Sequence, residues 1–310
     1  MTDAARVLRA LRREDWVSGR ELADSLSVSR TRVWHLIGEL RTLGYRIASI
    51  PGCGYRWRDQ FDPLDADLLA RWLPDAWTLG VDWYTDSTSD RVVSARVDCH
   101  IRFAEHQSAG RGRVGREWLS PPGGLYLSAG RWFPQLAGGP QSLSPWIACF
   151  IVDALRTAGF TRVCAKWPND LIIDAHKFGG ILVEIAGDPF GDCYVCVGVG
   201  VNWYAPGIDE QLVTGLAPQL PTDVQRNDIG ALLAGAVANS LDAYPPTTNS
   251  VIVELWRQVD GFNGTEVTCC HGDRVVSGTA DGIEPDGSLR LCTEEGLRHF
   301  AAGELRLRAI

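Results

Sequence analysis

The chain has 310 residues, of which 45% are hydrophobic and 22% are charged, and its formal net charge at pH 7 is −8. This length predicts two or three domains, and the composition is typical of a folded globular protein. The negative total excludes a uniformly basic nucleic-acid coat, although it leaves room for a local basic domain.

No signal for a membrane or for secretion is found. The longest uncharged stretch, residues 132–152, is interrupted by proline and glycine, so it does not predict a membrane-spanning helix. The first residues lack the apolar core of a signal peptide. Nine cysteines, an odd number in a long chain, indicate reduced thiols rather than a disulfide framework. We therefore expect a cytoplasmic protein with no membrane segment.

Residues 1–60 differ from the rest in charge, with a net of +4 against −12 for residues 61–310. Apolar residues at helical spacing start at Ala4, and Ser18 with Glu21 forms the capping-box pattern of a second helix. Ser29 can cap a third helix. Two strand-like pieces follow, at residues 45–47 and 54–57. Three helices and a hairpin predict a winged helix-turn-helix.

The third predicted helix carries candidate DNA-reading residues opposite its apolar face. They are Ser29, Arg30, Thr31, Arg32, Trp34 and His35. Arg46, Arg56 and Arg58 are available for backbone phosphates. Positive charge on an otherwise negative chain favours DNA as the partner. The alternative is a three-helix protein-interaction domain whose arginines are merely solvated.

A glycine-rich loop imitates a dinucleotide fingerprint. Residues 110–115 read G-x-G-x-x-G, but no buried strand precedes them and no apolar helix follows. Three arginines, Arg111, Arg113 and Arg116, would also crowd a helix N-terminus that is meant to receive phosphate. The better interpretation is a flexible loop that carries its own cations and orders around an anion. A solvated hairpin tip is the alternative.

The two lysines of the chain form an unusual pair. The other twenty-eight basic residues are arginines, and Lys166 and Lys177 lie in one short segment. Because an ammonium and a guanidinium are not interchangeable at a demanding site, both lysines are candidate functional residues. Chance survival of two surface lysines is the alternative.

Strand-like runs surround these lysines. Residues 171–173 and 181–185 predict a hairpin, with Asp170 leading in and Lys177 at the far end, and residues 194–201 predict a third strand. We expect a mostly antiparallel sheet with a charged loop above one face. Beyond residue 262, short runs at 266–270, 275–280, 289–291 and 305–307 separated by tight turns predict a small β-barrel.

Metal and nucleophile motifs are weak or absent. Cys193 and Cys196 form C-x-x-C without a second ligand pair at the right spacing, and residues 269–271 are too compact to complete it. Asp62, Asp65 and Asp67 are more typical of a linker and a helix start than of a metal site. The sequence contains neither a nucleophile elbow nor a Walker A motif.

Four motifs resemble those of the biotin–protein ligases, in order and approximate spacing. They are Asp86-Ser87-Thr88-Ser89, residues 105–116 (EHQSAGRGRVGR), Lys166-Trp167-Pro168-Asn169-Asp170 and residues 177–182 (KFGGIL). The winged helix is similar to that of the bifunctional form, which is both ligase and biotin operon repressor. The resemblance implies an α+β multidomain protein. Its expected parts are a winged helix-turn-helix at 1–60, a mixed α/β catalytic domain with a largely antiparallel sheet at 61–261, and an SH3-like barrel at 262–310.

The resemblance also implies a two-step reaction and assigns residues to it. Biotin and ATP give biotinyl-5′-AMP, from which biotin passes to a lysine of the biotin carboxyl carrier protein of acetyl-CoA carboxylase. Catalytic roles fall to Arg113, Lys177 and Asp170, with Asp170 as candidate base or orienting acceptor. Biotin contacts fall to Ser87, Thr88, Ser89, Gln107, Arg111, Gly112, Arg113 and Lys177. The phosphate-binding loop is Gly110, Arg111, Gly112, Arg113, Val114, Gly115 and Arg116, and Mg²⁺ is expected with ATP rather than in a protein cage.

The resemblance further implies operator DNA of biotin synthesis genes as a partner and a homodimer, at least on DNA. Trp118 is expected either to pack against ligand or to be plain core. The chain departs from the family pattern at Ser89, where many members have Asn, and at Val114, where some have Arg. Residues 208–222 align with an adenine-covering loop but carry no aromatic, so no adenine-stacking residue is assigned. A biotin-sensing regulator without turnover, a lipoate-type ligase, and a ligase whose N-terminal domain is a relic remain as alternatives.

Overall fold

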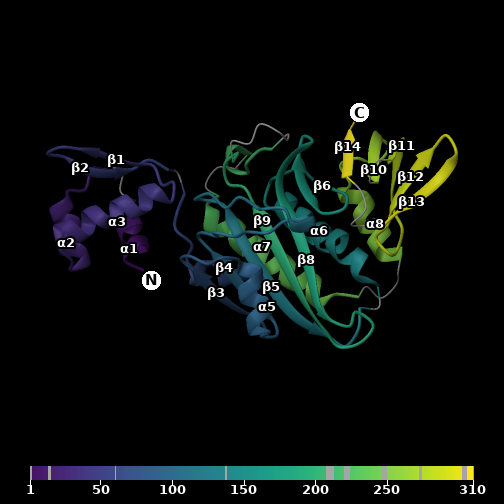
Figure 1. The fold of residues 1–310 in the computed structure, drawn as a ribbon, viewed down its shortest axis with the longest axis horizontal. Helices are drawn as coiled ribbons and strands as arrows, with labels where there is room; N and C mark the ends of the chain where they lie inside the picture. The colour runs from purple at the N-terminus through teal and green to yellow at the C-terminus, as the bar shows by residue number, and fades with distance from the viewer. Residues whose placement is uncertain are drawn as a thin grey trace.

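Three groups of elements follow one another along the molecule, with the N-terminal helices at one end and the C-terminal strands at the other (Figure 1). The structure is a computed structural model. It describes residues 2–12, 15–59, 61–136, 138–206, 213–219, 224–245, 250–271, 274–301 and 306–309. No helix among the described residues is long and apolar enough to cross a membrane.

The N-terminal part has the three helices and the hairpin that the sequence predicts. Helix α1 spans Asp3–Leu11, α2 Gly19–Leu26 and α3 Arg30–Thr42, and the hairpin consists of β1 Ile47–Ile50 and β2 Gly54–Trp57. The capping box of Ser18 and Glu21 is formed, and Ser29 caps α3 through the amide of Arg32. The first strand was expected at residues 45–47 but starts at Ile47, because Tyr45 is buried among aromatic residues of both the hairpin and the central domain.

The central part is built on a seven-stranded sheet in the order β3-β4-β5-β9-β8-β7-β6. Its strands are β3 Thr78–Asp82, β4 His100–Ala104, β5 Leu125–Phe133, β6 Val163–Lys166, β7 Asp170–Ile173, β8 His176–Gly187 and β9 Cys193–Val201. Strands β3 and β4 are parallel and every other pair is antiparallel, so the prediction of a mostly antiparallel sheet is confirmed. The predicted hairpin is β7–β8, and the predicted third strand is β9.

Helices cover the two faces of this sheet unequally. Helices α6 Pro140–Thr157, α7 Arg226–Asp242 and α8 Ser250–Val259 pack together, and Gly230 of α7 contacts Leu125 of β5. Short helix α5, Thr88–Ala95, lies on the other face, where Ser89 contacts Ser128 of β5. Because successive strand residues face opposite sides, Leu125 and Ser128 lie on different faces of β5. The face that carries only the short helix α5 is therefore the less covered one. Shorter helical pieces are α4 Ala66–Leu69, η1 Ala70–Trp72, η2 Arg113–Gly115 and η3 Ala217–Gln219.

Most of the breakers in residues 132–152 lie between β5, which ends at Phe133, and α6, which begins at Pro140. Proline is tolerated at the first position of a helix because the first amides there have no intrahelical acceptor. Pro145 is different, because it lies inside α6 in the second turn.

The C-terminal part is a five-stranded antiparallel sheet in the order β13-β12-β11-β10-β14. Its strands are β10 Glu266–His271, β11 Arg274–Ile283, β12 Leu289–Thr293, β13 Gly296–Phe300 and β14 Arg306–Ala309. The expected barrel is not closed among the residues that the structure describes, since β13 and β14 form the two edges of the sheet. Sequence reasoning missed β13, whose residues are largely exposed, and Leu305 of the expected last strand lies outside the described residues.

Candidate active site

A cluster of buried hydroxyl and amide groups lies where α5 meets β5. The amide and hydroxyl of Thr88 donate to Oε1 of Gln107 at 2.9 and 3.2 Å. The Oγ of Ser128 lies 2.8 Å from the Thr88 hydroxyl and 3.0 Å from that of Ser89. Nε2 of Gln107 donates to Ser120 at 3.0 Å. The structure thus brings Thr88, Ser89 and Gln107 together in one hydrogen-bonded cluster, as a site for a ligand rich in hydrogen-bonding groups requires.

Ser87 was predicted for this site and Ser128 was not, but it is Ser128 whose side chain bonds to the cluster. Ser87 is buried at the N-cap position of α5 but makes no side-chain capping bond there. Ser128 is completely buried, and its hydroxyl forms hydrogen bonds with those of Thr88 and Ser89, although it was not among the predicted site residues. The only signal was a serine in an otherwise apolar strand, on the side that alternation assigns to the face opposite Leu127 and Ala129.

Trp118 crosses the open face of the sheet over two glycines. A Cβ on Gly200 would lie 2.5 Å from the indole and one on Gly180 3.3 Å from it, so glycine at both positions lets the ring approach the strands. The ring is half-buried, and the Nζ of Lys177 lies 5.6 Å from its centroid. Its buried Nε1 has no hydrogen-bond partner among the described residues. Trp118 is therefore not plain core, and it presents an unmatched donor beside the polar cluster.

Asp170 lies between the two lysines of the chain. Its Oδ1 is 2.5 Å from the Nζ of Lys177, and its Oδ2 is 3.7 Å from the Nζ of Lys166. The backbone of Lys177 pairs with Ile172 near the end of the β7–β8 hairpin, as expected, but its side chain reaches back toward the start of β7. Both lysines thus share one carboxylate.

The loop 110–118 is a short hairpin and not a helix N-terminus. The amide of Gly112 donates to the carbonyl of Arg116 at 2.7 Å, and that of Trp118 donates to Gly110 at 2.8 Å. Its tip, Val114, has φ of 56° and is 80% exposed. The dinucleotide interpretation is excluded by this geometry, and the hairpin-tip alternative describes the shape of the loop.

Two arginines of this loop, which the sequence predicts to be flexible, already have protein partners. Arg113 is half-buried rather than exposed, and its Nη1 donates to Oδ1 of Asn169 at 3.2 Å. Burial lowers the pKa of this guanidinium and the Asp170 carboxylate opposes the shift, although arginine stays protonated. Arg111 pairs with Asp90 at 2.7 Å and Glu184 at 2.9 Å. Burial disfavours its charged form, but the two carboxylates outweigh burial and raise the pKa of Arg111.

The candidate DNA-reading face of α3 is open. Arg30, Thr31, Arg32, Trp34 and His35 are all exposed. Arg32 pairs with Glu39 at 3.2 Å, and the Ser29 hydroxyl is used as the helix cap. Of the phosphate candidates, Arg46 pairs with Asp59 at 2.5 Å and Arg58 lies 5.5 Å from the ring of Trp16, so both already have protein partners.

Asp65 caps α4, as a helix-start role predicts. No group of three His, Cys, Asp or Glu side chains that could hold a metal ion occurs within the described ranges. The side chains of Cys270 and His271 lie outside the described residues, as does most of the segment 208–222 expected to cover adenine.

Comparisons with known proteins agree with this geometry. The Biotin/lipoate A/B protein ligase family matches residues 85–202, an HTH domain matches residues 4–56, and the Biotin protein ligase C terminal domain matches residues 263–308. The chain is 30% identical to the bifunctional ligase/repressor BirA of Escherichia coli (strain K12), over 98% of this chain and 97% of that protein. It is 27% identical to the bifunctional ligase/repressor BirA of Bacillus subtilis (strain 168), over 94% of both.

The fold is similar to that of the biotin protein ligase from Aquifex aeolicus in complex with biotin and ATP. The TM-score is 0.65 at 26% identity, covering 75% of this chain and 99% of that one. The two curated relatives match from the N-terminal helices to the C-terminal sheet. The chain belongs to the biotin protein ligases of the biotin/lipoate A/B protein ligase family, in the form that also carries an N-terminal helix-turn-helix domain.

Proposed function

We propose that this chain is an ATP-dependent biotin–protein ligase that also represses biotin synthesis genes. The observation that carries the ligase proposal is the Asp170 carboxylate, flanked by Lys177 and Lys166 beside a buried polar cluster. Relatives named bifunctional ligase/repressor support the combination of the two functions in one chain. We place the reaction in the cytoplasm.

The polar cluster suits the ureido ring of biotin, which offers both donors and an acceptor. Thr88, Ser89 and Gln107 supply hydroxyl and amide groups, and Ser128 holds the hydroxyls in place. The unmatched Nε1 of Trp118 is a further donor for bound ligand. A buried donor without a hydrogen-bond partner destabilises the free protein, so a ligand that accepts this hydrogen bond gains affinity.

In the first step, a biotin carboxylate oxygen attacks the α-phosphorus of ATP, and the bond to pyrophosphate breaks. The carboxylate is already ionised at neutral pH, so the step needs charge neutralisation more than a base. We assign this neutralisation to Lys177 and Arg113. The residues 110–116 loop would enclose the phosphates, and Mg²⁺ bound with ATP would supply further positive charge.

In the second step, the amine of a carrier-protein lysine attacks the carbonyl carbon of biotinyl-5′-AMP, and AMP leaves. The amine must lose a proton as the new amide forms. Asp170 is the group we assign to orient that amine and accept its proton. Its two lysine neighbours hold the carboxylate in place at the start of β7.

The repressor role rests on the exposed face of α3 and on the HTH match. We propose operator DNA of biotin synthesis genes as its target and a homodimer as the binding form, since paired half-sites suit paired recognition helices. Ligand control requires that the adenylate-bound state favours dimerisation differentially.

Incubation of the chain with MgATP, biotin and the biotin carboxyl carrier domain tests the ligase proposal, with the carrier mass as the readout. We expect one biotinyl group on one lysine. A parallel incubation with lipoate distinguishes the lipoate-type alternative, for which that acid would be transferred instead. Binding of biotin without any change in carrier mass would leave only the sensor alternative.

A further inference from the structure

A buried hydrogen bond joins the C-terminal sheet to the segment that contains Asp170. Trp167 is 1% exposed, and its Nε1 donates to the carbonyl oxygen of Gly287 at 2.9 Å. Gly287 belongs to the turn between β11 and β12, more than a hundred residues away in the chain. Trp167 is three residues before Asp170 and directly follows Lys166, so this bond ends inside the candidate active site.

The turn that accepts this bond is itself firmly held. The amide of Gly287 donates to Glu284 at 2.9 Å, and the amide of Glu284 donates to Ser288 at 2.8 Å. Asp286 accepts the amide of Ser288 at 2.8 Å. These three hydrogen bonds hold the carbonyl that faces Trp167 in place relative to the C-terminal sheet.

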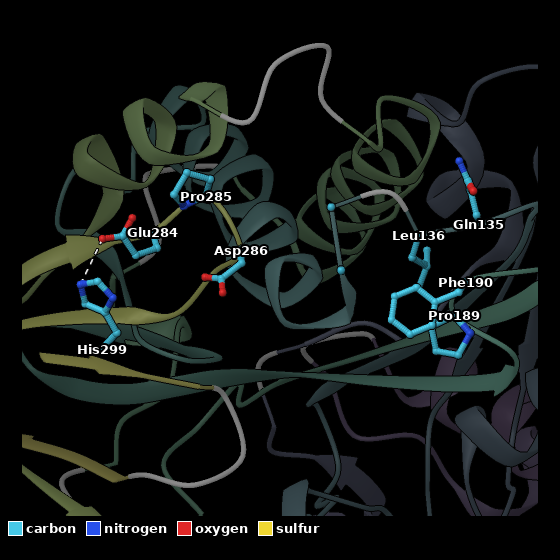
Figure 2. Close-up of a pocket in the computed structure, with 10 residues that line it drawn as sticks. Gln135, Leu136, Pro189, Phe190, Glu284, Pro285, Asp286 and His299 are labelled. Atoms are coloured by element: carbon cyan, nitrogen blue, oxygen red, sulfur yellow. Dashed lines mark ion pairs between the residues drawn. The ribbon is translucent and has the colours of Figure 1, made fainter.

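The turn also packs closely against the central domain. Gly287 has φ of +86°, and a Cβ there would lie 2.7 Å from the carbonyl oxygen of Gln141 and from the Cα of Ser142 in α6. Figure 2 shows Pro285 and Asp286 on one side of a groove of about 580 Å³, opposite Leu136 and Phe190 of the central domain. Only a residue without a side chain lets the backbone at position 287 come this close to α6.

A second contact holds the same segment from the other side. Just before the C-terminal sheet, the amide of Gly261 donates to the carbonyl of Ala165 at 2.9 Å. The Nζ of Lys166 lies 5.9 Å from the ring centroid of Phe262, which is itself buried. The segment 165–167 is therefore held by residues 261–262 and by the β11–β12 turn together.

We propose that the β11–β12 turn of the C-terminal domain is a positioning element for the ligase reaction, in which the Gly287 carbonyl orients Trp167 and thereby Lys166 and Asp170. This inference rests on the proposed ligase function and assigns a role to the C-terminal domain within it. Neither Gly287 nor Trp167 touches the reacting atoms, so both are positioning residues. A small displacement of a catalytic carboxylate lowers the rate without removing the ligand-binding groups.

The test compares two glycine substitutions in the full chain. Gly287→Ala places a methyl group against α6 and moves the turn, whereas Gly296→Ala has the same positive-φ strain (φ +111°) but nothing within 4 Å of the new methyl. Gly296 is the first residue of β13 and pairs with Thr293, where the next hairpin of the same sheet begins. We expect Gly287→Ala to lower kcat for carrier biotinylation by about tenfold to a hundredfold, with the KM for biotin little changed and the pH profile of kcat displaced. Gly296→Ala controls for strain alone.

Trp167→Phe is the second variant, because it keeps an aromatic ring and removes the indole N–H donor, together with part of the buried ring volume. We expect kcat to fall in the same direction, and Gly287→Ala to add little to the effect when both changes are combined. If both variants, folded, keep the kcat and pH profile of Gly296→Ala, the positioning role is overturned. A wild-type chain that transfers no biotin would instead overturn the ligase proposal, and the positioning role with it.

Discussion

Both lysines of an otherwise arginine-rich chain lie beside one carboxylate, within 4 Å of Asp170. A guanidinium is a planar fork that prefers two parallel contacts, whereas an ammonium is a compact charge that can approach one oxygen from any side. Lys177 makes such a single close contact at 2.5 Å. The geometry gives a reason why arginine, used everywhere else for positive charge, is replaced here.

Lys177→Ala tests this interpretation. We expect biotinyl-5′-AMP formation to slow by at least about tenfold, because a charge-assisted contact worth roughly 1.4 kcal/mol or more is lost. The measurement is pyrophosphate release under single-turnover conditions. Lys177→Arg is the matched control, since it keeps the charge and changes its shape. Equal rates for the Arg variant and wild type would mean that the rarity of lysine carries no information about this site.

Arg113→Gly tests the loop. We expect biotinyl-5′-AMP to dissociate faster, and to biotinylate bystander lysines, because a half-buried cation that we assign to the adenylate is lost. Its contact with Asn169 is lost as well, so a small stability change is also expected. Arg96→Gly removes an exposed cation from a left-handed position that glycine accepts, and it serves as control. An unchanged dissociation rate in the Arg113 variant would count against the cation loop.

At the scale of elements, the sequence predicted the features that neighbouring residues determine, such as helix caps and tight turns. The caps of α2 and α3, the β7–β8 hairpin and β9 are found where side-chain pattern and turn residues place them. Helix α7 gave no such signal, because it is buried on nearly all sides and lacks a polar face. The β5–β9 pairing and the role of Ser128 depend on which strands meet, and no local pattern encodes that.

The same limit applies to the loop of residues 110–116, whose ion-pair partners come from distant parts of the chain. The sequence shows that residues 110–116 carry cations, but not that Asp90 and Glu184 would meet Arg111. Those carboxylates come from α5 and β8, which are distant in sequence. The residues of the site were therefore predictable by motif, while their partners were not.

The end of β4 links the central sheet to the N-terminal domain through His106. Its Nε2 lies 3.1 Å from the hydroxyl of Tyr45, and burial lowers the pKa of His106 to about 4. The unfolded chain takes up a proton near pH 6.5, whereas the folded chain does so only near pH 4, so stability is lost as the pH falls through this window. The full loss is about 3 kcal/mol.

We therefore expect the free energy of unfolding to decrease between pH 6.5 and pH 4 more steeply in wild type than in His106→Gln, which keeps a polar partner for Tyr45 without the ionisable group. Urea unfolding at a series of pH values measures both curves. Comparison of the two removes the contributions of all other titrating groups. Parallel curves would show that His106 is protonated alike in both states.

At the scale of the molecule, polar contacts tie the N-terminal helices to the central domain. Arg9 pairs with Asp65 at 2.7 Å and Arg12 with Asp62 at 2.5 Å. Completely buried Arg226 of α7 pairs with Glu105 and donates to the carbonyl of Asp62.

We propose domain limits at 1–60, 61–261 and 262–310, and the three family matches lie within these limits.

The double variant Arg30→Ala plus Arg32→Ala separates the two functions of the molecule. We expect weaker binding of a biotin-operon duplex and a shallower salt dependence, because each lost phosphate contact removes counterion release. Carrier biotinylation should stay near wild type, since α3 lies outside the ligase site. Binding titrations at two salt concentrations and a biotin-transfer assay on the same preparation measure both.

Arg96→Ala plus Arg257→Ala removes the same charge from exposed positions outside the N-terminal domain and is the matched control. If the α3 variant binds the duplex as tightly as this control at both salt concentrations, α3 is not the DNA-reading element. The ligase proposal would be unaffected by that result.

The pairing of β5 with β9 at the middle of the sheet has a consequence for how the chain folds during synthesis. Residues 125–133 have one neighbour, β4, that is made before them, but they can pair with the other neighbour, β9, only after residues 193–201 have left the ribosome, with α6 and three other strands made in between. The N-terminal helices and hairpin, by contrast, have their pairing partners within the first 57 residues. Nascent chains fold domain by domain from the N-terminus, and distant strand pairing is slow. A DNA-binding domain thus forms first, on a chain whose ligase domain is still incomplete.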